Sequence, residues 1–385
     1  MQLQQRIRGW QVGMMAVLLA AVTVSVGHGD NPNEWRGAWN AVFTLTNDPD
    51  GNELAMFPLD NKGQMKPPVF IPTGGDGTGN SLGNQSALVM SKDTDYLYAV
   101  NPGSNTISVF RLTRQGPQVI QTVYSGGTRP ISIALRGELL YVLNAGGGVD
   151  DADSIAGFTV RENGRLRALP GSIRPLAKDD VDTGPAQIAF SPSGDALIVT
   201  LKATNKIAAY ALNRRGIPVD LAIEPSVGTT PFGFEFSRDG FLIVSEAFGG
   251  AAGASAVSSY WFDDDAGTLE PLGKSVPTTQ TAACWIAVTE NGALAYTTNT
   301  GSNTVTGYSV GKKGKLTRVT DNGIAAQTGA APTDMTVRGS NVLFVLNRND
   351  GSVGSYSIKN GGALAPIQVA GGLDGLLRPT GLVVR

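Results

Sequence analysis

One carboxylate stands out among the residues of this sequence that could do chemistry. Seven short apolar stretches end at matching positions, and five of them end in Asn. The seven residues are Asn47, Asn101, Asn144, Leu201, Glu246, Asn299 and Asn347. Glu246 could act as a general base that activates water or removes a proton next to a carbonyl group. The alternative is a solvated edge residue without a chemical role.

Basic residues at related positions could hold an anion. Arg129 and Arg378 each precede a proline, and Lys202 follows Leu201. Such side chains bind carboxylate or phosphate groups, and arginine does so with two parallel hydrogen bonds. We therefore predict a small molecule with a carboxylate or phosphate group as the ligand. The alternative is that these cations pair with acidic neighbours such as Glu246.

The asparagines allow two further interpretations. Asn ends strands well because its side chain bonds nearby backbone groups and tolerates left-handed turns, so turn chemistry repeated by duplication explains the Asn positions. Glu246 with Asn101, Asn144 or Asn299 would instead supply oxygen ligands suited to Ca²⁺ or Mg²⁺. We predict no cofactor, with this metal site as the alternative.

The elements that position these residues form a repeat. Each unit has an x-Pro start, an apolar strand, a polar turn, a second strand, a loop rich in Gly, Ser and Asn, and a third strand, as in GPAQIAFSPSGDALIVTLKATNKIAAYAL (184–212). A fourth, weaker strand such as 118–124 lies between units. Four short strands in each unit of roughly 50 residues are typical of a β-propeller blade. We predict an all-β, seven-bladed propeller of four-stranded antiparallel blades over residues 41–385.

The two ends of the repeat predict how the ring closes. Residues 378–385 match the opening strand of a unit, whereas the first unit begins at 41–47 without that strand. The C-terminal strand should therefore join the N-terminal blade, which leaves no open sheet edge.

The blade geometry predicts which residues meet. The second strand ends on the face where the innermost strand begins, so both groups of residues should surround the mouth of the central channel. The entry segments contain Gln85, Arg129, Gln187, Phe232, Trp285, Asp334 and Arg378. We predict Glu246 as the catalytic residue and the following as substrate-binding residues: Gln85, Arg129, Gln187, Lys202, Asn299, Asn347 and Arg378.

Two glycine-rich loops and one cysteine complete the predicted mouth. The loop at 72–85 should lie over this face as a flexible flap, since it lacks the Lys-Ser/Thr of a nucleotide cradle. The loop at 249–258 should help to shape the mouth. Cys284 is predicted to be a small buried residue, because no histidine is near it to activate the thiol.

Composition excludes several classes of protein. The only histidine is His28, so the body of the chain cannot contain a Ser-His-Asp triad, a Cys-His dyad or a zinc site of the usual type. A single cysteine cannot form an intrachain disulfide. The net charge is −2 and Lys and Arg are not clustered, which argues against nucleic acid as a partner. We expect a monomer.

The first residues are typical of an export signal. Arg6 and Arg8 precede an apolar run at 13–27, which is shorter than the ~20 residues of a membrane-spanning helix. We predict a signal peptide at 1–27 and a lead-in at 28–40. The mature protein would then be secreted or periplasmic and would not span the membrane; an uncleaved anchor is the alternative.

Several motifs resemble one family. The stretches GGDGTGNSLGNQSAL (74–88), VNPGSNTISVF (100–110), VSEAFGGAAGASAVSSY (244–260), QTAACWIAVT (280–289) and YTTNTGSNTVTGYSV (296–310) are similar to the seven-bladed β-propeller lactonases, labelled 6-phosphogluconolactonase-like or 3-carboxymuconate cyclase-like. The resemblance implies that a lactone of a sugar acid or of a carboxymuconate-type acid is opened or formed at the channel mouth.

The sequence departs from this family pattern in two places. Muconate-lactonizing members are thought to use histidine, which is absent here, and relatives often read VTEKATN where this chain reads VTLKATN at 199–205. Leu201 thus replaces a second carboxylate. A lactonase or a lactone-forming cyclase is the function that the resemblance implies, and a non-enzymatic exported binding or scaffold propeller is the alternative.

Overall fold

The computed structural model describes residues 40–146, 151–177, 182–264, 266–376 and 378–385. The chain divides into the units Met1–Glu34 and Trp35–Arg385, and all described residues belong to the second. The predicted signal peptide at 1–27 lies outside the described residues, as does the lead-in except for Asn40. Within the described residues, no helix is long and apolar enough to cross a membrane.

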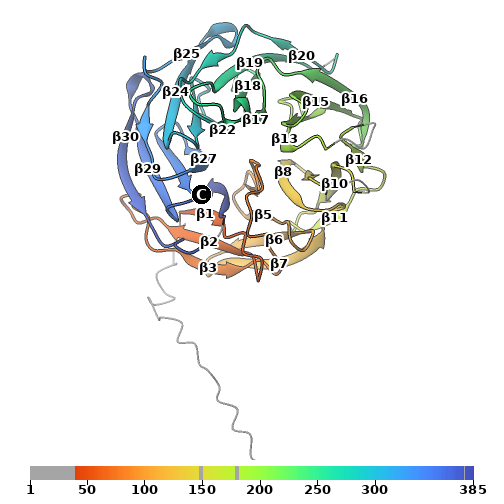
Figure 1. Ribbon diagram of the computed structural model, residues 1–385. Coiled ribbons are helices and arrows are strands. Elements are labelled where there is room, and N and C mark those ends of the chain that lie inside the picture. Colours follow the sequence, from red (N-terminus) through yellow and green to blue (C-terminus); the bar gives the residue numbers. More distant parts are fainter. Residues whose placement is uncertain (1–39, 147–150, 178–181, 265, 377) are drawn as a thin grey trace, which may run out of the picture. The chain divides into compact units, whose positions relative to one another are not determined.

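The described unit is a ring of seven antiparallel sheets around a central axis, as predicted (Figure 1). Blade 1 comprises β1 (Ala41–Leu45), β2 (Glu53–Pro58), β3 (Val69–Pro72) and β31 (Thr380–Val384). Blade 2 comprises β4 (Leu88–Met90), β5 (Tyr96–Asn101), β6 (Thr106–Thr113) and β7 (Gly116–Tyr124). Blade 3 comprises β8 (Pro130–Arg136), β9 (Leu139–Asn144), β10 (Ser154–Val160), β11 (Leu166–Ala168) and β12 (Arg174–Pro175).

The remaining blades repeat this order. Blade 4 comprises β13 (Pro185–Phe190), β14 (Ala196–Leu201), β15 (Lys206–Leu212) and β16 (Pro218–Pro225). Blade 5 comprises β17 (Pro231–Phe236), β18 (Phe241–Glu246), β19 (Ala256–Asp263), β20 (Thr268–Pro271) and β21 (Val276–Pro277). Blade 6 comprises β22 (Ala283–Val288), β23 (Leu294–Asn299), β24 (Thr304–Val310), β25 (Leu316–Arg318) and β26 (Ala326–Gln327). Blade 7 comprises β27 (Pro332–Arg338), β28 (Val342–Asn347), β29 (Ser352–Ile358) and β30 (Leu364–Ala370). Short 3₁₀ turns are η1 (Phe248–Gly250), η2 (Lys312–Gly314) and η3 (Asn360–Gly362).

Ring closure follows the sequence prediction. Strand β31 is the innermost strand of blade 1 and pairs antiparallel with β1, with Phe43 opposite Val383 and Thr44 opposite Leu382. The backbone N–H of Arg385 donates to the carbonyl of Ala41 at 2.9 Å. The first and last strands of the described unit therefore complete one sheet, and no innermost edge stays open.

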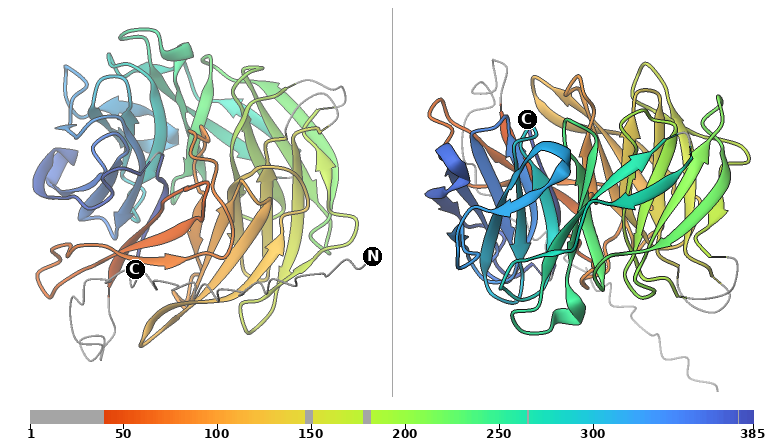
Figure 2. Two further views of the ribbon diagram at one scale, coloured as in Figure 1. Left: turned by 60° about the horizontal axis from the view of Figure 1, so that its bottom comes forward. Right: turned by 90° about the horizontal axis from the view of Figure 1, so that it is seen from above.

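Apolar side chains fill the space between neighbouring blades, and tyrosines link the blades at their edges. The side chains of Tyr98, Tyr141 and Tyr296 are fully buried on second strands. The Tyr98 hydroxyl donates to the carbonyl of Gly164 in blade 3, at 3.0 Å, and the Tyr296 hydroxyl donates to that of Gly362 in blade 7, at 2.9 Å. These links join neighbouring blades of the ring, which Figure 2 shows from two further directions.

Candidate functional site

The seven matching residues at the ends of the second strands do not face the channel. All are buried, with at most 1% of each side chain exposed. Asn101 donates to the hydroxyls of Thr106 and Ser108, and Asn299 donates to those of Thr304 and Thr306, on the third strand of the same blade. These two side chains therefore tie second strands to third strands within their own blades.

Glu246 lies inside blade 5. Its carboxylate accepts hydrogen bonds from the backbone N–H of Gly228 at 2.7 Å, from the Ser258 hydroxyl at 2.6 Å and from the Ser275 hydroxyl. Burial raises the pKa of Glu246, and these hydrogen bonds oppose that rise. A Cβ on Gly228 would lie 2.2 Å from Oε2, so the chain leaves room for this carboxylate. The predictions that Glu246 lies at the mouth or at a solvated edge are both wrong, because its side chain is 0% exposed.

The four predicted metal ligands lie in four different blades. Glu246 belongs to blade 5, whereas Asn101, Asn144 and Asn299 belong to blades 2, 3 and 6. Among the described residues, no group of three or more His, Cys, Asp or Glu side chains could hold a metal ion. Binding of Ca²⁺ or Mg²⁺ stays a prediction for which the described residues offer no common site.

We expect Glu246→Gln to lower the stability of the protein. The amide nitrogen of Gln cannot accept the bonds that one carboxylate oxygen accepts now, so the free energy of unfolding should fall by about 1–3 kcal/mol. Urea unfolding measures this loss, and Glu270→Gln, at an exposed carboxylate of the same blade, is the matched control. Unchanged stability combined with lost lactone turnover would instead support the predicted catalytic role of Glu246.

The next residue along each second strand points toward the mouth, because side chains alternate between the two faces of a strand. Lys202 follows Leu201, and Arg348 follows Asn347. The Lys202 ammonium donates to the carbonyls of Gly83 at 2.7 Å and Pro185 at 2.6 Å. Burial is the main cause that lowers the pKa of Lys202 to about 8. The sequence alignment that selects Lys202 also selects Arg348, which our sequence analysis missed.

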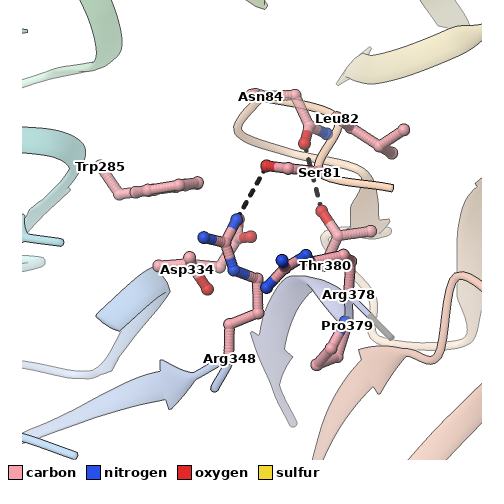
Figure 3. Close-up of a pocket in the computed structure, with 11 residues that line it drawn as sticks. Ser81, Leu82, Asn84, Trp285, Asp334, Arg348, Arg378, Pro379 and Thr380 are labelled. Atoms are coloured by element: carbon pink, nitrogen blue, oxygen red, sulfur yellow. Dashed lines mark hydrogen bonds between the residues drawn. The ribbon is translucent and has the colours of Figure 1, made fainter. Parts of the chain in front are cut away.

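Arg348 lines a small pocket at the mouth, drawn in Figure 3 and called here the Arg348 pocket. Its walls are Ser81, Leu82, Gly83, Asn84, Trp285, Thr333, Asp334, Arg348, Arg378, Pro379 and Thr380. The Arg348 guanidinium donates to the Ser81 hydroxyl at 2.8 Å. Arg378 lines the same pocket (Figure 3), and desolvation and the charge of Arg378 both lower the pKa of Arg348.

Two donors in this pocket have no acceptor. The indole Nε1 of Trp285 and the Nε of Arg348 are buried and have no hydrogen-bond partner among the described residues. Trp285 is 4% exposed, so its N–H has little access to water. Buried donors normally find a partner, so both N–H groups are available to an acceptor that enters this pocket.

Asp334 is the acidic group of the same pocket. It lies on β27 and is 3% exposed, and one carboxylate oxygen accepts a hydrogen bond from the Gly381 N–H at 2.8 Å. Burial raises the pKa of Asp334 to about 7, although the Gly381 bond and the charge of Arg348 oppose the rise. A carboxylate that titrates near neutral pH can take up and release a proton, as a general base requires.

The loop before β4 enters the channel instead of forming a flap above it. The Gln85 side chain donates to the carbonyl of Ile286 at 2.7 Å and accepts from the N–H of Ile286 at 3.0 Å. The Gln85 N–H donates to the carbonyl of Ala186 at 3.1 Å, and Asn84 donates to that of Ile131. The segment therefore contacts blades 3, 4 and 6 across the axis, as the orange chain in the centre of Figure 1 shows.

A glycine makes room for this crossing. Gln187, two residues after Pro185, bonds both backbone groups of Phe234 in the next blade, at 2.9 and 2.7 Å. The equivalent position after Pro231 is Gly233, and a Cβ there would lie 2.0 Å from Oε1 of Gln85. Gln85 thus makes, from a distant segment, the inter-blade contact that a side chain at 233 would make.

Gly233→Ala should therefore displace Gln85. The added methyl group overpacks the channel, and we expect a loss of about 1–3 kcal/mol in the free energy of unfolding. Hydrogen exchange at the Gln85 and Ile286 amides measures the release directly. Gly371→Ala is the control, because an added Cβ there meets nothing within 4 Å; equal protection in both variants would contradict this account.

The other predicted ligand-binding residues are only partly brought together. Arg378 lines the Arg348 pocket and donates to the Asn349 side chain at 2.9 Å. Arg129 donates to the carbonyl of Ala145 at 2.8 Å, so neither of these bonds goes to Glu246. Asn347 donates to Ser352 inside blade 7, away from the pocket. Gln187 is occupied by the contact with Phe234.

A second pocket adjoins the first and is called here the Phe232 pocket. It is lined by Gly184, Lys202, Ala203, Asn205, Thr229, Thr230, Phe232, Ala247, Phe248, Gly249, Gly250, Ala282 and Cys284. The Phe232 and Trp285 rings, 4.9 Å apart, lie between the two pockets. Gly249 and Gly250 confirm that the loop at 249–258 shapes the mouth. Cys284 is buried as predicted, and burial raises the pKa of its thiol to about 12.

Comparison with known proteins agrees with this architecture. The family described as "Lactonase, 7-bladed beta-propeller" matches residues 51–174, 152–285 and 254–372. A search of curated proteins found no sequence match.

Solved structures show the same fold at low identity. A periplasmic gluconolactonase from Pseudomonas aeruginosa is 19% identical, with a TM-score of 0.67 over 90% of this chain and 98% of that one. A protein from Lactobacillus plantarum is 19% identical, with a TM-score of 0.69 over 90% and 99%. A provisionally assigned 6-phosphogluconolactonase from Bacteroides fragilis is 18% identical, with a TM-score of 0.67 over 90% and 98%. With the family match over most of its length, this chain belongs to the seven-bladed β-propeller lactonase family.

Proposed function

We propose that the protein hydrolyses a lactone at the channel mouth, or forms one in the reverse reaction. The observation that carries this proposal is the Arg348 pocket, a cavity of about 10 Å³ lined by the buried carboxylate of Asp334, by Arg378, and by Trp285 and Arg348 with their unpartnered donors. Family membership supports the reaction class. The substrate classes that we propose are lactones of sugar acids and of carboxymuconate-type acids.

Asp334 replaces Glu246 as the general base in this mechanism. The carboxylate of Asp334 removes a proton from water, and the resulting hydroxide attacks the lactone carbonyl carbon. The oxyanion that forms would be stabilised by the N–H groups of Trp285 and Arg348. The ring C–O bond then breaks, and its oxygen takes the proton back from Asp334. The product is the open hydroxy acid.

Arg378 and Lys202 would hold a further carboxylate of the substrate. Arg378 lines the same pocket, and Lys202 lies at its edge through its bond to Gly83. The hydrogen bonds that Gln85 and Asn84 make inside the channel hold the pocket wall in place. A catalytic role for Glu246 stays a prediction, although its three bonds within blade 5 favour Asp334.

The test is a pH-stat screen of purified protein against sugar-acid and muconate-type lactones, with and without Ca²⁺. We expect turnover that Asp334→Asn abolishes and that Glu246→Gln reduces only in proportion to lost folded protein. No turnover of any lactone would contradict the proposal and favour a binding propeller.

The pH range over which the protein hydrolyses lactones should be narrow. Asp334, with a pKa of about 7, must be ionised, and Lys202, with a pKa of about 8, must be protonated. The value of kcat/KM should therefore rise through pH 7, peak at about pH 7.5 and fall above pH 8. Lys202→Arg should extend the alkaline limb because Arg keeps its charge. A value of kcat/KM that does not change between about pH 7 and pH 8 would contradict the assignment of Asp334 and Lys202 to the two limbs.

We also propose export, since Arg6, Arg8 and the apolar run at 13–27 form an export signal. Cell fractionation of the tagged full-length chain should recover a shortened form outside the cytoplasm. Recovery of the full-length chain in the cytoplasm would contradict it.

A further inference from the structure

The Phe232 pocket has a hydrocarbon surface. The side chains of Phe232, Phe248, Ala247 and Ala282 contribute to it, and Cys284 adds a thiol that burial keeps protonated by raising its pKa to about 12. Phe232 is 7% exposed and packs on Trp285 of the neighbouring Arg348 pocket. A ligand that reaches from one pocket to the other must therefore pass this pair of aromatic rings.

Several polar groups around the Phe232 pocket form hydrogen bonds with one another. The Asn205 side-chain oxygen accepts from the Thr230 N–H at 2.7 Å, and the Thr230 hydroxyl oxygen accepts from the Gly249 N–H at 3.0 Å. The carbonyls of Thr230 and Thr229 accept from Ala247 and Phe248 at 3.0 and 3.2 Å. Asn205 and Thr229 are exposed, whereas Phe232, Ala247 and Cys284 are buried, so the polar groups lie at the rim and the apolar groups line the interior of the pocket.

One cation stands at the border of the two pockets. The Lys202 ammonium lies 5.1 Å from the centre of the Phe232 ring and lines the Phe232 pocket, while its bond to Gly83 reaches the wall of the Arg348 pocket. The two pockets thus present a hydrocarbon surface on one side and positive charge with free donors on the other. This division matches an amphipathic acid rather than a uniformly polar one.

We propose that the ligand is a hydrocarbon-substituted lactone, whose alkyl or aryl part binds in the Phe232 pocket and whose ester group binds beside Arg348. This inference rests on the reaction in the proposed function, lactone hydrolysis, and departs from the sugar-acid and carboxymuconate-type substrates named there. A polyhydroxylated lactone would place hydroxyls against the buried side chains of Phe232 and Ala247, where they lose water without gaining partners, which is unfavourable. An alkyl chain of the same length gains free energy by leaving water.

The experiment compares two lactones of one ring size, δ-decalactone and glucono-δ-lactone. We expect kcat/KM to be at least about 10-fold higher for δ-decalactone, the size of effect that burial of a few methylene groups gives. Phe248→Asn should lower this ratio several-fold; Asn tolerates the left-handed backbone that Phe248 adopts, with φ 49°. Phe70→Asn, at an exposed aromatic on β3, should leave the ratio unchanged.

Two outcomes separate the failure of this inference from failure of the proposed function. Preference for glucono-δ-lactone, or an unchanged ratio in Phe248→Asn, overturns the inference while lactone hydrolysis stands. If other lactones of the wider screen are turned over but neither of these two is, the inference is overturned. If no lactone at all is turned over, the proposed function fails, and calorimetric titration with 5-hydroxydecanoate and gluconate tests the Phe232 pocket. Tighter binding of 5-hydroxydecanoate, weakened by Phe248→Asn, supports the hydrocarbon pocket; tighter binding of gluconate overturns it.

Discussion

Asp334→Asn should lower kcat/KM for lactone hydrolysis by about 10²–10⁴-fold, the range that loss of a general base produces. The amide has the same shape, and its oxygen can still accept from Gly381, so the pocket should keep its structure. Initial rates by pH-stat at about pH 7.5 measure the effect. Asp374→Asn, at an exposed carboxylate, is the control.

A measurement of the stability of Asp334→Asn distinguishes a loss of catalysis from a loss of folded protein. The pKa of Asp334 is raised in the folded protein, from an ordinary value of 3.8 to about 7, so its contribution to stability is present below pH 4 and is lost as the pH rises to 7. The neutral amide has no such loss, and Asp334→Asn should be at least as stable as the unmodified protein at pH 8. Full activity in Asp334→Asn would assign the base to another residue.

Deletion of residues 378–385 should prevent folding. It removes β31, leaves the inner edge of β1 without its partner and takes away the Gly381 N–H that bonds Asp334. A closed ring cannot lose one innermost strand without wider disruption, because blade 7 packs on this strand through Leu382. Circular dichroism and size-exclusion chromatography should show an unfolded or aggregated chain. Deletion of Arg385 alone is the control, and a compact, soluble 1–377 chain would contradict the closure mechanism.

The fold was readable from the sequence because each repeat carries its own local signals. Alternating apolar residues mark the strands, prolines mark the inner-strand starts in most units, and the unmatched strand at 378–385 reveals the closure. These signals depend on residues close together in the chain, which is why the predicted blades match the observed ones.

The site was harder to predict because it depends on side-chain direction and on distant contacts. The side chain of Glu246, at the end of a second strand, points into its blade. Lys202 and Arg348, each one residue after the end of a second strand, point to the mouth. The alternation of side chains along a strand could have indicated this difference. The pairing of Gln85 with Gly233 joins segments far apart in sequence, and no local pattern announces it. The free donors of Trp285 and Arg348 became evident only when their surroundings were known.

The central claim is that the Arg348 pocket binds and opens the lactone. A crystal structure of Asp334→Asn with an unreacted lactone tests it most directly. The account predicts the ester carbonyl oxygen within hydrogen-bonding distance of Trp285 Nε1 and Arg348 Nε, with the side chain at 334 beside the carbonyl carbon. A lactone bound against Glu246, or on the opposite face of the ring, would contradict it.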